Sequence, residues 1–336
     1  MSMNETGLLT FEAAEKLVFE FEGLLQAQGI TIAPGSELSR GCELLMELKE
    51  RHKNPRDEPW ATLRADLQLA VGTLQIVRHV IRSRASTGFQ QLVPHLKLLS
   101  EGSVAQNVAS DREDDVSNKI LELLVACGLV DRVTDLELDD PVKSSGGRNP
   151  DVLCRFDGPT WGFACKAIHG DAPMTLFGNL EKGVNQIEAS AAETGIVVFN
   201  FKNRLPHAEI FPGLSEGKDP VLFAYRDVDA AVWKLQTWVR KRFEAMVAEV
   251  TPDELWKFLR PKKALPGALV VVETGVGAVT DKGPLPTLLG FLQLIPLVFS
   301  PLSLPDPFAG KPMGCLRQLN DGLQLVDRRS PLIVLG

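Results

Sequence analysis

The sequence is poor in cysteine and tyrosine, with five cysteines and one tyrosine among 336 residues. The cysteines form no Cys-x-x-Cys pair, and their number is odd. This pattern argues against a secreted disulfide framework and against a zinc ribbon. The sequence also lacks an HExxH motif, a GxSxG motif and a Walker loop. These absences exclude the zinc-protease, α/β-hydrolase and P-loop chemistries that depend on such motifs.

A signal peptide and a membrane span are not expected either. The N-terminal segment is acidic and has no apolar core, which predicts a cytoplasmic protein. The longest apolar stretch, 285–304, is interrupted by Gln293 and by prolines at 286, 296 and 301. Because these residues disfavour a membrane helix, we expect a buried core segment there.

Charge is distributed unevenly along the chain. The net charge of −7 disfavours nonspecific binding to nucleic acid. Residues 111–200 contain 8 Lys and Arg against 16 Asp and Glu, whereas residues 201–336 contain 17 against 14. The acidic middle of the chain is either a solvated face or a cluster of carboxylates with a cation.

Residues 1–110 are predicted to form an all-helical N-terminal domain. Apolar residues recur at helical spacing near 11–25, over 38–51 and over 60–83. The polar run 100–115 is the expected linker, which places the domain boundary near residue 110. No catalytic motif occurs in this region, so we expect it to mediate homodimerisation or binding to a partner protein.

Residues 111–336 are predicted to form a second domain of the α/β class. Periodicity and turn signals predict helices and strands in the order αβββαβ, at 116–127, 130–138, 151–156, 161–168, 176–192 and 195–201. The dipeptide Asp157-Gly158 separates the second and third strands and is typical of a hairpin. Further strands are predicted at 268–279 and 322–326.

Two residues with catalytic chemistry lie on the hairpin. Strand alternation places Ala164 and Lys166 on one face, and Cys165 on the opposite, core face. Asp151 opens the partner strand after Pro150, so its carboxylate is expected near Lys166. An aspartate and a lysine in this arrangement are suited to holding a divalent cation and a water nucleophile.

The strings NPDVLCRF and WGFACKAI, with the element order around them, resemble the PD-(D/E)xK nuclease superfamily. The resemblance covers about residues 115–201 and implies a restriction-endonuclease-like core. It implies that Asp151 is a metal ligand and that Lys166 positions or deprotonates the attacking water. Glu122 matches the glutamate that the upstream helix often adds, and an exposed helical glutamate is the alternative. Gln186 matches a helical glutamine that contacts DNA, and an ordinary surface amide is the alternative.

Position 164 departs from the family pattern. The family has Asp or Glu two residues before the lysine, whereas this chain has Ala164. An inactivating substitution, a natural pseudonuclease and a migrated acid are three explanations; Glu122, Asp157 and Glu181 are the candidate replacements. We favour the first explanation, in which a parent protein carries glutamate at position 164 and cuts nucleic acid.

The expected cofactor is Mg²⁺ or Mn²⁺, held by Asp151 and Glu122. Carboxylates that meet at one point repel each other unless a cation compensates them, and oxygen ligands favour these two ions. In such a site the metal and Lys166 together would stabilise charge at the phosphate.

Basic residues near aromatic ones predict a nucleic-acid contact in the C-terminal region. A helix over 225–250 contains Trp233 and Trp238, which we expect in the core. The residues predicted to contact the nucleic-acid backbone are Arg240, Lys241, Arg242, Lys262 and Lys263.

Two functions from different classes follow. The first is a Mg²⁺-dependent endonuclease acting on double-stranded DNA, of the kind used in bacterial restriction or anti-phage defence, impaired here by Ala164. The second is a noncatalytic nucleic-acid-binding or assembly protein built on a decayed nuclease fold. The two functions differ at position 164.

Overall fold

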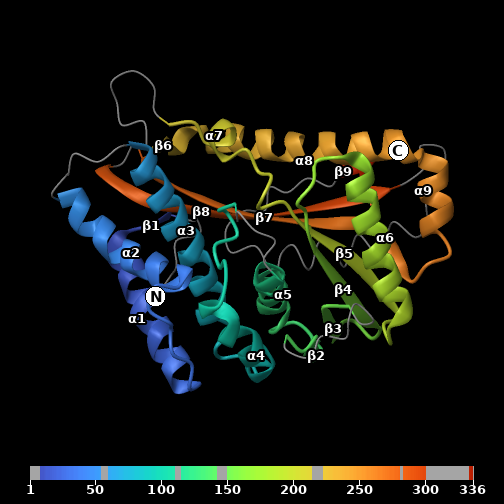
Figure 1. Ribbon diagram of the computed structural model, residues 1–336, viewed down its shortest axis with the longest axis horizontal. Coiled ribbons are helices and arrows are strands. Elements are labelled where there is room, and N and C mark those ends of the chain that lie inside the picture. Colours follow the sequence, from blue (N-terminus) through green and yellow to red (C-terminus); the bar gives the residue numbers. More distant parts are fainter. Residues whose placement is uncertain are drawn as a thin grey trace.

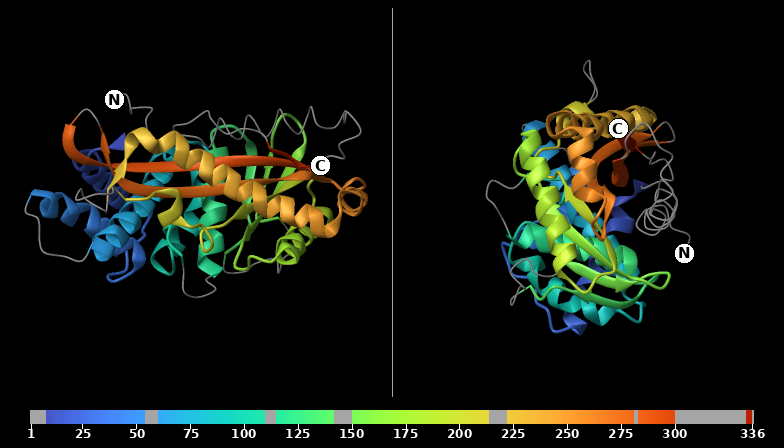
Figure 2. Two further views of the ribbon diagram at one scale, coloured as in Figure 1. Left: turned by 90° about the horizontal axis from the view of Figure 1, so that it is seen from above. Right: turned by 90° about the vertical axis from the view of Figure 1, so that its right-hand side faces the viewer.

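The protein has a mixed α/β fold in which helices cover both faces of one mixed sheet (Figure 1). The structure, a computed structural model, describes residues 8–53, 60–109, 115–141, 150–213, 222–280, 283–299 and 333–335. The described strands form a nine-stranded sheet with the order β1-β8-β7-β5-β4-β3-β2, and β6 and β9 pair at β7 and β8. The views in Figure 2 show the layers from above and from one end.

The N-terminal third of the chain is helical, apart from one short strand. It contains β1 (Leu8–Leu9), α1 (Phe11–Ala27), α2 (Glu37–Lys53), α3 (Trp60–Ser83), η1 (Phe89–Leu92), α4 (Val93–Leu96) and η2 (Lys97–Ser100). Helix α3 has the bounds that its apolar stripe predicts. Strand β1 was not predicted, because two leucines carry no periodicity. Its register, Leu8 with Leu289 and Leu9 with Leu288, joins the N-terminal region to β8.

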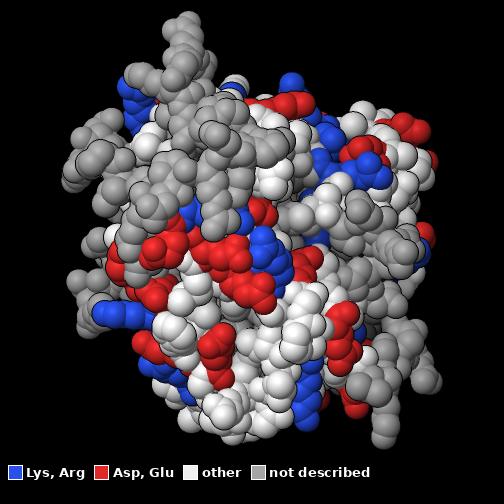
Figure 3. Space-filling view, turned by 60° about the vertical axis from the view of Figure 1, so that its left-hand side comes forward, with Lys and Arg blue, Asp and Glu red and all other residues white. Residues whose placement is uncertain are grey.

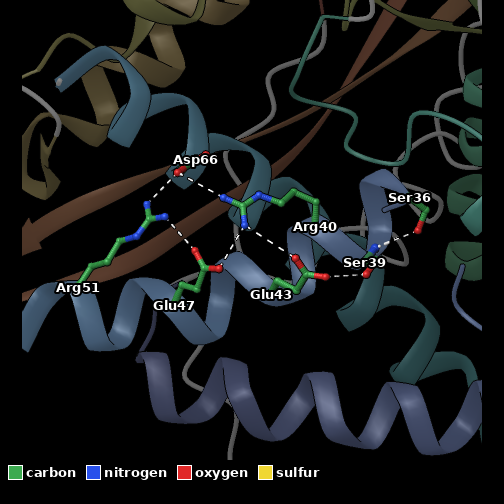
Figure 4. Close-up of polar contacts among 7 residues, drawn as sticks. All are labelled: Ser36, Ser39, Arg40, Glu43, Glu47, Arg51 and Asp66. Carbon is green, nitrogen blue, oxygen red and sulfur yellow. Dashed lines mark hydrogen bonds and ion pairs between the residues drawn. The ribbon is translucent and has the colours of Figure 1, made fainter. Parts of the chain in front are cut away.

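Ion pairs on the surface join α2 to α3 (Figure 4). Arg51 lies 2.8 Å from Asp66 of α3 and 2.8 Å from Glu47 of its own helix. Arg40 lies 3.9 Å from the same Asp66 oxygen and 3.2 Å from Glu47. The side chains of Arg51 and Asp66 are only 15% and 18% exposed, so solvent screens this pair less than a fully exposed one.

The middle of the chain has the predicted element order. It contains α5 (Asp115–Leu129), β2 (Thr134–Leu138), β3 (Val152–Arg155), β4 (Thr160–Ala167), α6 (Pro173–Ala189) and β5 (Thr194–Asn200). Strands β2, β3 and β4 are antiparallel neighbours, and β5 lies parallel to β4 with Ala164 opposite Val197. Asp157 and Gly158 have φ angles of 49° and 107°, the left-handed geometry that a tight hairpin needs. The predicted hairpin is confirmed.

The C-terminal region completes the sheet. It contains α7 (His207–Ile210), β6 (Phe223–Ala224), η3 (Tyr225–Asp227), α8 (Val228–Val250), α9 (Pro252–Leu259), β7 (Ala264–Thr280), β8 (Gly283–Phe299) and β9 (Ile333–Leu335). Strand β7 contains the predicted strand 268–279, and β8 contains most of the apolar stretch 285–304, which is buried over residues 288–299. Within the described residues, no helix has the length and apolar character needed to span a membrane. The strand predicted at 322–326 lies outside the described residues.

Two apolar cores lie on the two faces of the sheet. One contains residues of α1, α2, α3 and α5 together with one face of the strands, and the other contains residues of α6, α8 and α9 with the opposite face. Helix α3 approaches β7 and β8 closely, because a Cβ atom at Gly275 would overlap Val71 and one at Gly290 would overlap Gln75. The helices of residues 8–100 therefore share their core with the sheet.

The segment expected to be a solvated linker is partly buried. Val104, Ala105, Gln106 and Asn107 are at most 1% exposed. The Glu37 carboxylate accepts hydrogen bonds from the backbone N–H groups of Val104 and Ala105, each at 2.8 Å, and Asn200 donates to Gln106 at 2.7 Å. Polar composition misled the sequence prediction here, because these polar groups bind protein rather than water. The predicted boundary near residue 110 lies outside the described residues.

Candidate active site

Asp151 and Lys166 lie together, as the hairpin predicted. Asp151 directly precedes β3, and its Oδ2 atom accepts a hydrogen bond of 2.6 Å from the backbone N–H of Cys165 on β4. The Nζ atom of Lys166 lies 3.6 Å from the same oxygen. The side chains of Asp151 and Lys166 are 12% and 14% exposed, so the pair is largely shielded from water yet not sealed from it.

Gln186 joins this pair from the neighbouring helix. It projects from α6, and its Oε1 atom accepts a hydrogen bond from the Nζ of Lys166. Lys166 also donates to the carbonyl of Cys165 at 3.0 Å. Gln186 is half-buried, and its contact with Lys166 distinguishes it from the surface amide that was the alternative. Aspartate, lysine and glutamine thus meet from three consecutive elements.

Glu122 belongs to the same electrostatic cluster from the opposite helix. It lies on α5 and is 2% exposed, which excludes the exposed-glutamate alternative. Its Oε2 atom lies 3.0 Å from His95 Nε2, and its carboxylate lies 3.0 Å from Lys119 Nζ. Burial raises the pKa of Glu122 well above its usual value, the charge of Asp151 raises it further, and Lys119 opposes both effects.

Lys119 lies among three carboxylates. Besides Glu122, its Nζ atom lies 3.9 Å from Asp139, at the end of β2. Burial lowers the pKa of Lys119, but the charges of Glu122, Asp151 and Asp139 and the hydrogen bond to Glu122 outweigh burial and raise it. The ammonium group is therefore the charged form that this cluster stabilises.

His95, from the N-terminal helical region, completes the surroundings of Glu122. It is 1% exposed, and burial lowers its pKa to about 4, with a further lowering by Lys119. A neutral imidazole donating from Nε2 to the carboxylate satisfies the contact with Glu122. Sequence reasoning missed Lys119, His95 and Asp139. Only Lys119 had a usable signal, because it precedes Glu122 by three residues on one helix face.

Ala164 directly precedes Cys165 on β4 and lies in an apolar environment. It is 0% exposed and belongs to the core under α6, together with Leu180 and Val184. Cys165 points into the opposite core, as predicted, and burial raises the pKa of its thiol well above the usual value. Among the candidate replacements for the missing acid, Glu122 lies in the cluster. Asp157 lies in the exposed hairpin turn and Glu181 is exposed on α6.

The carboxylates do not form a complete metal site. Among the described residues, no group of three or more His, Cys, Asp and Glu side chains has an arrangement that could hold a metal ion. Glu122 and Asp151 are the predicted ligands, yet each already contacts a lysine ammonium. The donor set of this chain therefore does not fit Mg²⁺ or Mn²⁺ as it stands.

The five basic residues predicted to contact nucleic acid divide into two groups. Arg240 and Lys241 are exposed on α8. Arg242 instead lies 3.7 Å from the ring centroid of Trp238 and 3.3 Å from Asp171. Lys263 donates to the carbonyls of Glu188 and Ser190 at the end of α6, and Lys262 lies 5.7 Å from the ring of Phe258. Arg242 and Lys263 thus connect elements of the fold.

The expectation that Trp233 lies in the core is wrong, since it is 65% exposed on α8. Trp238 is half-buried, with its ring centroid 5.4 Å from that of Phe201. The two tryptophans are five positions apart, so the helical turn places them on different sides of α8. Trp233 therefore lies exposed on the same helix as Arg240 and Lys241.

Acidic side chains gather on the side of the molecule shown in Figure 3. Helices α1 and α2 contribute exposed acidic residues, namely Glu12, Glu20, Glu22, Glu43, Glu47 and Glu50. A phosphate backbone is repelled by such a surface, whereas the exposed basic residues of α8 attract it.

In comparisons with known proteins, no family model, no curated protein and no solved structure matches this chain.

Proposed function

We propose that this protein is a nuclease of the restriction-endonuclease-like type that acts on DNA, with hydrolysis impaired by alanine at position 164. The observation that carries the proposal is the meeting of Asp151, Lys166 and Gln186, which come from consecutive elements in the order αβββαβ. Asp-Lys pairs also form ordinary ion pairs. This pair differs from an ordinary ion pair, because Gln186 accepts a hydrogen bond from Lys166 and the buried Glu122 belongs to the same cluster.

The chain's own residues have separate tasks in this proposal. The ammonium of Lys166 attracts and orients a phosphate oxygen, because it is partly exposed and charged. Gln186 fixes the position of that ammonium. The hydrogen bond from Cys165 to Asp151 fixes the carboxylate beside it. No hydrolytic step is assigned to a metal, because the donor set is incomplete without an acid at position 164.

The experiment that tests the proposal is cleavage of plasmid and linear DNA in Mg²⁺ or Mn²⁺. The proteins compared are the chain itself, Ala164→Glu and Ala164→Glu with Lys166→Ala. We expect cutting by Ala164→Glu and none by the double variant. An Ala164→Gln protein is the matched control, since it adds nearly the same volume without the negative charge of a carboxylate ligand. Cutting by Ala164→Gln equal to that by Ala164→Glu would contradict the assignment of position 164 to the site.

A second function is supported by a different observation. Ala164 is completely buried among apolar side chains, and Glu122 is already paired with Lys119 and His95. These contacts favour a noncatalytic nucleic-acid-binding or assembly protein on a decayed nuclease fold. This alternative predicts DNA binding by the unmodified chain that is insensitive to EDTA, and no cutting by any of the variants.

A further inference from the structure

The carboxylate cluster contains an internal cation, Lys119, which contacts one of the two predicted metal ligands. Lys119 Nζ lies 3.0 Å from Glu122 and 3.9 Å from Asp139. Asp151, the other predicted ligand, contacts Lys166 instead, with 3.6 Å between Oδ2 and Nζ. The carboxylates that the nuclease resemblance assigns to a metal therefore face a lysine.

The charges around this lysine are poorly shielded by water. The Lys119 side chain is 15% exposed and that of Glu122 is 2% exposed. Ionised groups at this burial interact more strongly than surface pairs do, and leaving one of them without a partner is costly. His95 is the other polar side chain in contact with Glu122, with 3.0 Å between Nε2 and Oε2. Lys119 is thus the cation in hydrogen-bond contact with Glu122.

A divalent cation and an ammonium cannot share this position. Both require the oxygens of Glu122, and their like charges repel at short distance. Mg²⁺ and Mn²⁺ bind carboxylate oxygens at about 2 Å, so either ion would displace the Lys119 ammonium from its 3.0 Å contact with Glu122.

We propose that the ammonium of Lys119 occupies the cation position beside Glu122, so that it weakens the binding of a divalent cation by this chain. The inference concerns the site described under Proposed function and rests on its ligand assignment. It adds a role for the contact between Lys119 and Glu122 within α5.

The test is a titration of the full-length chain with Mn²⁺ alone. Binding is measured by calorimetry and by the loss of the electron paramagnetic resonance signal of free Mn²⁺. Lys119→Met keeps the length of the side chain and removes its charge, whereas Lys119→Arg keeps a positive charge. We expect Lys119→Met to bind Mn²⁺ about tenfold more tightly than the unmodified chain, and Lys119→Arg to bind as weakly as the unmodified chain. Lys182→Met, at an exposed position of α6, is the matched control and should not change the affinity.

The double variant Lys119→Met with Glu122→Gln should show no gain in Mn²⁺ affinity, because the carboxylate of Glu122 is removed. The proposal is overturned if folded Lys119→Met and Lys119→Gln proteins bind no more tightly than the unmodified chain. It is also overturned if Lys119→Arg gains as much as Lys119→Met, or if the double variant keeps the gain. If the neutral variants are unfolded in the absence of metal, Mn²⁺ must restore their folding, and its failure to do so also overturns the proposal.

These titrations contain no nucleic acid, so they separate this inference from the proposed function. A gain in Mn²⁺ affinity together with no cutting by Ala164→Glu rejects the nuclease proposal alone. Cutting by Ala164→Glu together with unchanged Mn²⁺ affinity in the Lys119 variants rejects the Lys119 proposal alone.

Discussion

The carboxylate of Asp151 is hydrogen-bonded to the backbone N–H of Cys165, one residue before Lys166. This 2.6 Å hydrogen bond connects the residue before β3 to β4, next to Lys166. Asp151 therefore has a structural task that is separate from any ligand task. Variants of Asp151 will change stability as well as function, and the two effects must be measured separately.

Asp151→Ala leaves the buried N–H of Cys165 without its acceptor and removes the partner of Lys166. We expect the free energy of unfolding in urea to fall by about 2 kcal/mol. Asp151→Asn keeps an acceptor oxygen for Cys165 and should lower the free energy of unfolding by less. Asp135→Asn, in an exposed pair with Arg155, is the control and should change stability by less than about 0.5 kcal/mol. Equal losses for the alanine and asparagine variants would show that the Cys165 contact is unimportant.

Glutamate at position 164 places a carboxylate in the apolar core under α6. We expect Ala164→Glu to lower the free energy of unfolding by about 2 kcal/mol in the absence of divalent cations, because both extra volume and an unpaired charge are buried. Mn²⁺ should recover part of this loss by ligating the new carboxylate. Ala164→Gln should be destabilised without recovery. Urea titrations with and without Mn²⁺ measure both effects, and recovery in the glutamine variant would argue against ligation at position 164.

The raised pKa of Glu273 predicts how the stability of the protein depends on pH. It is 1% exposed on β7, and burial raises its pKa to about 8, although Lys202 and Arg78 lower it. Between its ordinary value of 4.5 and about 8, the folded protein keeps a proton that the unfolded chain has released. The stabilisation is complete below pH 4.5 and is lost as the pH rises to about 8. Its slope is at most about 1.4 kcal/mol per pH unit.

Glu273→Gln isolates this contribution. The difference in free energy of unfolding between the unmodified chain and the variant should decrease steadily from pH 5 to pH 8. The buried histidines act in the opposite direction below pH 6.5 and cancel in this difference, because both proteins contain them. Glu244→Gln, at an exposed position of α8, is the control for removing a carboxylate from the surface. A flat difference for Glu273→Gln would contradict the raised pKa.

The exposed basic residues of α8 predict the salt dependence of DNA binding. Arg240→Ala with Lys241→Ala should weaken binding to duplex DNA and reduce the slope of log affinity against log salt by about 1.8. Arg242→Ala should leave that slope unchanged and lower stability, because Arg242 stacks on Trp238 and pairs with Asp171. Fluorescence anisotropy over a range of salt concentrations measures the slope. Equal slopes for the double variant and the unmodified chain would exclude this helix as the DNA contact.

Local periodicity predicted the elements well where one face of the chain is apolar. The bounds of α3 and the Asp157-Gly158 hairpin depend on residues that are close together in the sequence, so both could be predicted from it. The meeting of Asp151 with Lys166 also follows, since adjacent strands fix it. His95 could not be predicted as a neighbour of Glu122, because their contact depends on how α4 packs against α5. The roles of Arg242 and Lys263 were missed for the same reason.

The pairing of β1 with β8 joins residues that are almost the whole chain apart. During synthesis on the ribosome, helices α1, α2 and α3 emerge long before β7 and β8, whose face they cover. The apolar stripe of α3 must remain without its sheet until β7 and β8 have been synthesised. Contacts between such distant segments carry a large entropy of loop closure and slow the folding step that forms them. The helices therefore complete their core only after β7 and β8 have emerged, and a chain that ends before β7 exposes the surface of α3 that the sheet would bury.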